Sequence, residues 1–557
     1  MLQKNIGKKM SHAESAMPLQ NPLLSRLEEL NAIGIALSSE RDINRLLETI
    51  LLAAMRITHA DAGTLYLLEP DKQELTFEIM RTNSLGKALG GTTGKPIPAS
   101  VFPIQLYKEG EANHSMVVAH AALSGASVNI PDAYKADGFD FSGTKGFDKK
   151  SGYRSTSFLA VPMRNHENEI IGVLQLINAL DRNTGEIVAF SRQEQSLLES
   201  LASQAAIALS NRRLIQQMED LFESFISLIN TAIDDKSPYT GGHCERVPAL
   251  TMMLADAVNR TSQGPLKDFV MTEKDRYELK IAGLLHDCGK ITTPVHVVDK
   301  STKLETIFDR IHLIDTRFEV LKRDAEISML RGLQNEGGNP EAAQSLGAAF
   351  EAHIRQLDED RDFLRLCNIG SERMDASHQQ RVQRIGSYRW HNEAGEQVGF
   401  LSAEEMENLN ISAGTLTAAE RQIINRHIDV TIKMLESLPW PRHLRKVPEY
   451  AGGHHERMDG SGYPKGLKRE QMSLQARVMG IADIFEALTA KDRPYKRGKT
   501  LNESLAILGK FKESGHIDPD LFDVFVREKV YLQYAQQFLD QEQIDDVEES
   551  RIPGFAK

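Results

Sequence analysis

The sequence predicts a multidomain protein: an N-terminal α+β domain, a long connecting helix, and a C-terminal all-α domain with a large helical insertion. Three observations predict this plan. A length of 557 residues suggests three or four folding units, at roughly 100–200 residues each. Short strand-like runs with alternating apolar residues stop at Ile177. Helical spacing of apolar residues then dominates from Ser191 to Phe538.

The N-terminal domain follows a polar stretch, residues 1–22, that we expect to be flexible. Helical spacing and two pairs of strand-like runs come next. The helices are Leu23–Ile35 and Leu46–Ile57, and the strands are Thr64–Leu68, Leu75–Met80, Phe158–Met163 and Ile170–Ile177. A polar loop, 137–152, separates the two strand pairs. This order predicts an α+β domain over residues 23–213, with an antiparallel sheet and flanking helices.

A connecting helix is predicted over residues 191–235, where the stretch from Ser191 to Asp234 contains neither Pro nor Gly. Its second half carries apolar residues in alternating steps of four and three, a heptad pattern. They are Leu214, Met218, Leu221, Phe225, Leu228 and Ala232. A helix packed on its own domain and a parallel dimer helix both give such a pattern, and we favour the dimer.

The C-terminal domain is predicted over residues 230–540. A polar, charge-rich stretch from about 305 to 415 interrupts it and is interpreted as an insertion. The acidic tail, 541–557, is expected to be flexible.

Composition excludes several classes of protein. The formal net charge of −12 argues against a nucleic-acid coat, because phosphate binding needs surplus positive charge. Three cysteines form no disulfide framework or zinc motif, which predicts a cytoplasmic protein. No apolar stretch approaches the ~18–20 residues of a membrane span.

Adjacent histidine and carboxylate residues carry the chemistry. His286 precedes Asp287, and His454 and His455 precede Glu456. Neighbouring helical residues point about 100° apart, so both reach one ion only near a helix end or at a two-ion site. Imidazole with carboxylate suits Fe, Mn, Ni or Zn.

Four motifs follow one another in the C-terminal half. They are Thr240–Val247, His286–Ile291, His454–Leu467, and Ala482–Thr489 followed by Arg493–Lys496. Together they resemble the HD-GYP branch of the HD metal-dependent phosphohydrolases, over about 230–515 apart from the insertion. The resemblance implies a cyclic dinucleotide substrate, with cyclic di-GMP favoured.

The resemblance also implies roles for single residues. The metal ligands would be His243, His286, Asp287, His427, His454, His455 and Asp483, with Asp287 bridging two ions. Asp287 and Lys290 would be catalytic, with Lys290 beside the scissile phosphate. Substrate contacts would come from Lys290, Arg493, Lys496, Gly462, Tyr463 and Pro464.

Two positions leave choices open. The family places a histidine eleven residues after the Leu of Leu-Thr-x-x-Glu, which selects His427 after Leu416. His312 follows Leu304 by eight and is the weaker candidate. Some members bind a third metal through a Glu where this chain has Tyr239. We therefore expect two divalent transition metals, Fe or Mn first, with Ni, Zn or Mg as alternatives.

The front half resembles a GAF domain. The resemblance rests on the two helices and on Val128–Tyr134, Phe147–Arg154 and Leu159–Met163. The cyclic-nucleotide signature is partial: Asn178 and Phe190 persist, whereas Ala179, Glu194 and Gln195 replace its Lys, Asp and Glu. Binding of an unknown small molecule and a purely dimerising role both stay open. A thioether-linked bilin is excluded, because this half has no cysteine.

The two resemblances together imply a GAF-regulated phosphodiesterase of bacterial second-messenger signalling. It would hydrolyse cyclic di-GMP to linear pGpG, and onward to GMP in part of the family. A homodimer and a GGDEF-type or other signalling partner are expected. The alternatives are a weakly active or inactive cyclic-dinucleotide receptor and a phosphohydrolase of another cyclic nucleotide.

Overall fold

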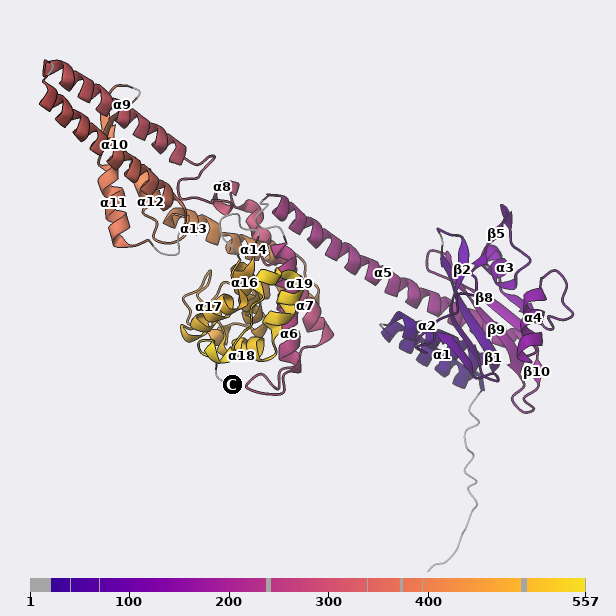
Figure 1. Cartoon of the computed structure of the whole chain (residues 1–557). Coiled ribbons are helices and arrows are strands. Elements are labelled where there is room, and N and C mark those ends of the chain that lie inside the picture. The colour runs from indigo at the N-terminus through magenta and orange to yellow at the C-terminus, as the bar shows by residue number, and fades with distance from the viewer. Residues whose placement is uncertain are drawn as a thin grey trace, which may run out of the picture. The chain divides into compact units, whose positions relative to one another are not determined.

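The computed structural model describes residues 22–40, 42–69, 71–236, 242–337, 339–370, 374–392, 394–491 and 498–555. The chain divides into two compact units, Met1–Phe222 and Glu223–Lys557 (Figure 1). The predicted flexible N-terminus lies, up to residue 21, outside the described residues.

The first unit is an antiparallel sheet with helices on both faces (Figure 1). The strand order is β3-β2-β1-β9-β8-β7, with β4 paired to β2 and β10 to β9. Its helices are α1 (Pro22–Ser39), α2 (Ile43–Thr58), α3 (Val117–Ser124) and α4 (Ser142–Ser151). Its strands are β1 (Ala60–Glu69), β2 (Glu74–Thr82), β3 (Lys87–Gly90), β4 (Ile104–Gln105), β5 (Tyr107–Lys108), β6 (Glu111–Ala112), β7 (Val128–Ile130), β8 (Phe158–Arg164), β9 (Ile170–Leu180) and β10 (Ile187–Val188).

Both predicted strand pairs are confirmed as antiparallel ladders, β1 with β2 and β8 with β9. Each face of the sheet has its own core, because alternate side chains of a strand point to opposite faces. Ile50 of α2 shares one core with Leu198 of the connecting helix. Val118 of α3 and Phe158 belong to the other core.

The stretch 137–152, predicted as a loop, contains α4, so this part of the prediction is wrong. Asp148 explains the difference, because its buried carboxylate accepts hydrogen bonds from outside the stretch. The donors are the Tyr134 hydroxyl at 2.8 Å and the Ser155 backbone amide at 2.8 Å. Such tertiary contacts override the weak helix propensity of a Gly- and Ser-rich segment.

The connecting helix is α5 (Arg192–Lys236), one continuous helix. Its first turns are buried in the core of the first unit, through residues such as Leu201 and Ala205. The heptad residues of the second half are exposed instead. Leu214, Met218, Leu221, Phe225 and Leu228 are 48–71% exposed.

The described residues of the second unit form helices and a small hairpin. Its α-helices are α6 (His243–Arg260), α7 (Glu273–Leu285), α8 (Val295–Val298), α9 (Ile311–Asn335), α10 (Pro340–Asn368), α11 (Ala376–Gly386), α12 (Ala403–Leu409), α13 (Ala418–Asn425), α14 (His427–Glu436), α15 (Val447–Gly452), α16 (Leu474–Thr489), α17 (Leu501–Glu513), α18 (Pro519–Arg527) and α19 (Val530–Phe538). Its 3₁₀ turns are η1 (Cys288–Thr292), η2 (Arg442–Leu444), η3 (Arg469–Gln471), η4 (Gln541–Gln543) and η5 (Glu549–Arg551). The hairpin, β11 (Arg389–His391) with β12 (Gln397–Gly399), was not indicated by the sequence pattern.

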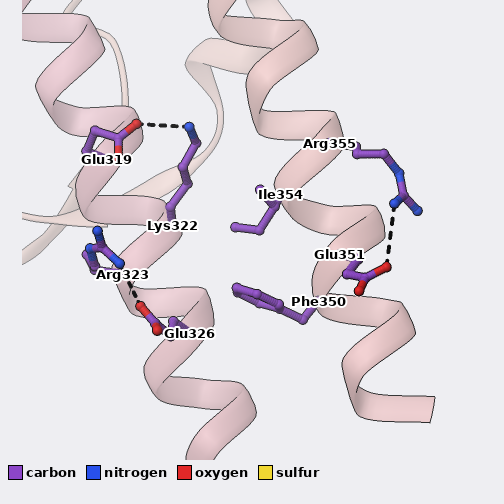
Figure 2. A pocket seen from close by; sticks show the side chains of 8 residues that line it. All are labelled: Glu319, Lys322, Arg323, Glu326, Phe350, Glu351, Ile354 and Arg355. Carbon is purple, nitrogen blue, oxygen red and sulfur yellow. Dashed lines mark hydrogen bonds and ion pairs between the residues drawn. The ribbon is translucent and has the colours of Figure 1, made fainter. Parts of the chain in front are cut away.

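The polar stretch after Leu304 has a core of its own, formed by residues from Leu304 to Leu409. Its helices α9 and α10 run side by side as a long hairpin (Figure 1). Between them lies a cavity of about 400 Å³, lined by Phe350, Ile354 and six charged residues (Figure 2). None of its lining residues is a predicted site residue. The limits 305 and 415 of the insertion stay a prediction.

The base of this segment is tied to the rest of the unit by two buried lysines. Lys300 Nζ lies 2.8 Å from Glu420 Oε2 of α13 and 2.8 Å from Asn408 Oδ1. Lys303 Nζ donates to the carbonyl oxygen of Ile411 at 2.8 Å. The two ends of the segment are therefore held close to each other, next to the start of α13, which is followed by α14.

The expectation of a flexible tail from residue 541 is wrong for the described residues. Gln543 is buried and donates to the carbonyl oxygens of Thr489 and Lys499, at 2.9 and 3.0 Å. Ile552 is also buried. These partners lie far away in the sequence, so the acidic composition of the tail gave no sign of them.

A buried carboxylate, Asp518, holds the elements behind the candidate site together. It accepts from Arg469 Nε at 2.9 Å and contacts Arg477 of α16. It also caps α18 through the Asp520 and Leu521 amides. Burial raises the pKa of Asp518, but the bonds from Arg469, the Leu521 amide and Arg477 outweigh it and hold that pKa below its usual value.

We expect Asp518→Asn to lower the unfolding free energy at pH 7 by about 3 kcal/mol, because it removes the buried carboxylate that the partly buried Arg469 and Arg477 share. The pKa of Asp518 is lower in the folded than in the unfolded protein. Its contribution to stability is therefore complete above the unfolded-state pKa of about 3.9 and is lost as the pH falls below that value. The difference from wild type should therefore shrink in acid. Urea unfolding followed by the fluorescence of Trp390 and Trp440, the two tryptophans of the chain, measures it in the second unit.

Asp268→Asn is the matched control, since Asp268 is exposed. An Asp518→Asn chain as stable as this control at pH 7 would contradict the assignment.

Candidate metal centre

Seven histidine and aspartate side chains converge in the second unit. One group consists of Asp287, His427, His454 and His455, and the other of His243, His286 and Asp483. Within each group, one donor atom per residue lies within 4.8 Å of the others. These are the seven residues that the sequence predicted as metal ligands.

Helix ends bring most of these side chains to one place. His243 and His427 are the first residues of α6 and α14, and His286 directly follows α7. His454 lies two residues after the end of α15, whereas Asp483 lies inside α16. At a helix end the chain leaves the 100° helical rotation, so adjacent residues can face one centre.

Three of the histidines are oriented by backbone carbonyls three residues earlier. His286 Nδ1 lies 2.8 Å from Gly283 O, His427 Nδ1 2.5 Å from Ile424 O, and His454 Nδ1 2.6 Å from Ala451 O. A carbonyl oxygen only accepts, so each Nδ1 carries the proton. In the neutral ring, Nε2 then keeps its lone pair, as in metal-ligating histidines.

The two oxygens of Asp287 face two of these lone pairs. Oδ1 lies 3.2 Å from His427 Nε2, and Oδ2 lies 3.2 Å from His286 Nε2. Oδ1 is buried and has no hydrogen-bond donor among the described residues. Acceptors buried against each other are unfavourable without a positive charge between them. Asp287 thus lies where the two groups meet, with one oxygen toward a histidine of each.

His454 gives an independent sign of a cation site. Its Nε2 is buried and has no partner among the described residues. Burial and the neighbouring His286 lower the pKa of His454 to about 4, and burial with His454 nearby lowers the pKa of His455 well below its usual value. Both rings are neutral at pH 7 and keep lone pairs. This donor set of imidazoles and carboxylates fits divalent transition metals.

His243 is oriented differently, by a carboxylate. Its Nδ1 lies 2.6 Å from Glu486 Oε2, and Glu486 Oε1 lies 2.7 Å from Arg246 Nη2. Burial disfavours the charged forms, but this ion pair outweighs it. The pKa of His243 rises to about 9 and that of Glu486 falls to about 2. The sequence reasoning gave Glu486 no role, although its position three residues after Asp483, on the same face of α16, was a usable signal.

Lys290 lies at the edge of the centre, in the turn η1. Its Nζ is 2.5 Å from Asp287 Oδ2. Burial lowers the pKa of Lys290, but Asp287 outweighs it and raises that pKa, so the ammonium keeps its charge. The predicted catalytic pair is therefore in contact.

Comparison with known proteins agrees with both resemblances. Residues 42–209 match the family described as GAF domain, and residues 240–366 and 397–521 match families described as HD domain. The chain carries a GAF domain followed by an HD domain.

Curated relatives match parts of the chain. A 3'3'-cGAMP-specific phosphodiesterase of Vibrio cholerae is 48% identical over 81 residues, 14% of this chain and 19% of the relative. A cyclic di-GMP phosphodiesterase of Pseudomonas aeruginosa is 39% identical over 114 residues, 20% of this chain and 26% of the relative. One of Thermotoga maritima is 28% identical over 193 residues, 30% of this chain and 52% of the relative. The chain thus spans between a fifth and about half of their lengths.

The loop after His455 encloses the HD-domain site from one side. The Tyr463 ring stacks on the His455 ring, with centroids 4.8 Å apart. Glu456, to which sequence reasoning gave no role, is buried and accepts from the Lys465 and Leu467 amides at 2.7 and 2.8 Å. A side chain at Gly462 would meet the Arg457 amide nitrogen at 2.4 Å, so only glycine fits there.

The structure brings His427, not His312, to the two groups. His312 lies exposed in the first turn of α9. Three further predicted positions, Arg493, Lys496 and Tyr239, lie outside the described residues. Their roles stay predictions, as does the role of Pro464, which follows Tyr463 in the loop.

In the GAF domain, the two persisting residues of the cyclic-nucleotide signature serve the fold. Asn178 is buried, accepts from the Thr156 amide at 2.7 Å and donates to the Arg154 carbonyl at 2.8 Å. Phe190 belongs to the core under α2. Both residues therefore have structural roles that need no ligand.

Replacing His427 by Ala should remove a donor that faces Asp287, and we expect the purified protein to lose at least part of its bound metal. His312→Ala is the matched control and should keep the wild-type metal content, because His312 lies outside the two groups. Metal analysis of both proteins after identical loading decides between the two histidines. Equal metal loss from both variants, or loss from His312→Ala alone, would contradict the assignment.

Proposed function

We propose that this chain is a metal-dependent phosphodiesterase that hydrolyses cyclic di-GMP to linear pGpG, with onward hydrolysis to GMP as an optional second step, under control of its GAF domain. The observation that carries the proposal is Asp287, whose two oxygens face acceptor nitrogens of both histidine groups. The relatives named above, phosphodiesterases of cyclic dinucleotides, support the substrate class. The described residues include no helix that is long and apolar enough to cross a membrane.

The seven donors would hold two divalent cations, with Asp287 between them. Such cations supply charge neutralisation at the phosphate and lower the pKa of water. Fe or Mn suits the donors best, with Ni, Zn or Mg as alternatives. Burial raises the pKa of the Cys288 thiol to about 11, so this neighbouring sulfur stays protonated and is a poor competing ligand.

The chain's own residues would then orient and neutralise the substrate. The Lys290 ammonium would stabilise negative charge that develops on the phosphate. Tyr463, held on His455 within the Gly462–Pro464 loop, would border the substrate, and Arg493 and Lys496 would contact its phosphates. In this proposal Asp287 and Lys290 act on the reacting atoms, whereas Glu486 acts through His243.

Partners and compartment belong to the same proposal. The GAF domain would take an unidentified small molecule, and a GGDEF-type or other signalling protein would be a partner. Nucleic-acid polymers are not expected, given the net charge of −12. The cytoplasm is proposed because all three cysteines are unpaired.

Product analysis tests the hydrolysis. Protein loaded anaerobically with Fe or Mn should convert cyclic di-GMP to linear dinucleotide, and Asp287→Ala should form none. Lys290→Met should keep its metal and lose on the order of 10²–10³ in kcat, because one charge-stabilising contact is removed. Chromatography of the products, with metal analysis of each protein, separates these outcomes.

A second substrate belongs in the same assay. The Vibrio cholerae relative acts, by its name, on 3'3'-cGAMP, so this dinucleotide is the alternative substrate. Hydrolysis of 3'3'-cGAMP alone would replace cyclic di-GMP in the proposal. Binding of either dinucleotide without any product would favour the receptor.

We also propose a homodimer formed along α5. Five apolar side chains at heptad spacing are 48–71% exposed on its second half, a costly surface unless another helix covers it. A second copy offers the matching seam. The same helix, α5, would then contact a second copy of the chain through its exposed seam and pack on the HD domain through its last turns.

Met218→Lys should shift the protein from dimer to monomer, because it places a charge in the middle of this seam. Gln216→Lys adds the same charge on another face of the same turn and should leave the dimer intact. Sedimentation equilibrium of the full chain measures both. A wild-type monomer, or a dimer that survives Met218→Lys, would contradict the proposal.

A further inference from the structure

The last turns of α5 contact the segment that carries His286, Asp287 and Lys290. Asn230 Nδ2 donates to the carbonyl oxygen of Leu284, at 3.0 Å. Lys236 Nζ donates to the carbonyl oxygens of Lys290 and Ile291, at 3.3 and 2.5 Å. These contacts lie entirely within the second unit.

The accepting carbonyls lie at helix ends, where carbonyl oxygens lack partners inside the helix, although Lys290 O also accepts from the Thr293 amide at 3.0 Å. Leu284 lies in the last turn of α7, and Lys290 and Ile291 lie in η1. Gly283 O, next to Leu284, is taken by the His286 ring. The backbone around Asp287 is thus capped from two sides, by a metal-site histidine and by α5.

The same stretch of α5 has two opposite faces. Ile226, Asn230 and Ile233 are buried, at 2%, 9% and 3% exposure, with heptad spacing. Phe225 and Leu228, on the seam described above, are more than half exposed. A rotation or axial shift of α5 that changes the exposed seam must therefore also move Asn230 and Lys236 against the turn after α7.

We propose that Asn230 and Lys236 are positioning residues of the metal centre. Their side chains fix the backbone of residues 284–291 and so set where Asp287 and Lys290 point. The position of α5 thereby tunes turnover. The catalytic part of this inference rests on the proposed phosphodiesterase function, whereas the structural part does not.

Hydrogen exchange and kinetics of the full, metal-loaded chain test the inference. In Lys236→Met, the amides of residues 286–292 should exchange about fivefold faster, as expected for the loss of a hydrogen bond. Its kcat on cyclic di-GMP should fall about tenfold at an unchanged KM, because the turn carries groups that act on the transition state. Lys236→Arg keeps a donor and should restore most of both. Asn230→Ala should repeat the exchange effect around Leu284.

Lys280→Met is the matched control. Lys280 lies on α7 and pairs with Glu223 of α5 at 2.8 Å, but it contacts neither carbonyl of η1. This partly exposed pair contributes little, so exchange at 286–292 and kcat should stay within about twofold of wild type.

Two results would overturn the inference: wild-type exchange at residues 286–292 in Lys236→Met, or the same acceleration in Lys280→Met. A wild-type protein that hydrolyses no dinucleotide would instead refute the proposed function. The exchange measurement would still decide whether Lys236 fixes the turn.

Discussion

The contact between Asp287 and His427 is the constraint on which the second unit depends. Oδ1 and Nε2 lie 3.2 Å apart, and His427 Nδ1 is already committed to the Ile424 carbonyl. Two buried acceptors at this distance cost on the order of 2–7 kcal/mol unless a positive charge lies between them. The fold holds them there because each sits at a rigid helix end, α7 for Asp287 and α14 for His427. A cation bound to both atoms would turn this unfavourable contact into a favourable one.

The orientation of the histidines follows from what precedes each of them in the chain. His286 and His454 follow helices, and His427 comes two residues after the end of α13, so each has a carbonyl three residues earlier within reach. His243 begins α6 directly after a loop glycine and uses Glu486 of α16 instead. A carboxylate that is itself held by Arg246 makes this imidazole a more basic ligand than a carbonyl would. Local chain geometry thus orients the rings of His286, His427 and His454, whereas a distant carboxylate orients His243 and the Tyr463 ring stacks on His455.

Sequence reasoning reached the fold class, the strand pairs and the seven residues of the centre, because these depend on local periodicity and on contiguous motifs. His427 could be identified from its spacing alone, eleven residues after Leu416. What the sequence did not reveal depends on contacts between distant residues. The role of Glu486 rests on a partner 243 positions away, and Gln543 packs on a carbonyl 54 positions away, where a flexible tail was expected. The hairpin β11–β12 lies in a polar stretch, and its strands of three residues are too short for alternating apolar and polar residues to predict them.

Two elements outside the metal centre contact the chain close to the two residues of the central contact. Asn230 and Lys236 of α5 fix the backbone on either side of Asp287. Lys300, at the base of the α9–α10 segment, is bound to Glu420, near the start of α13, and α13 leads directly into His427. One partner of the contact is therefore held by the connecting helix and the other by the polar segment. In the proposed arrangement, a displacement of α5 would be transmitted to the backbone beside Asp287, and a displacement of Lys300 to the helix that precedes His427.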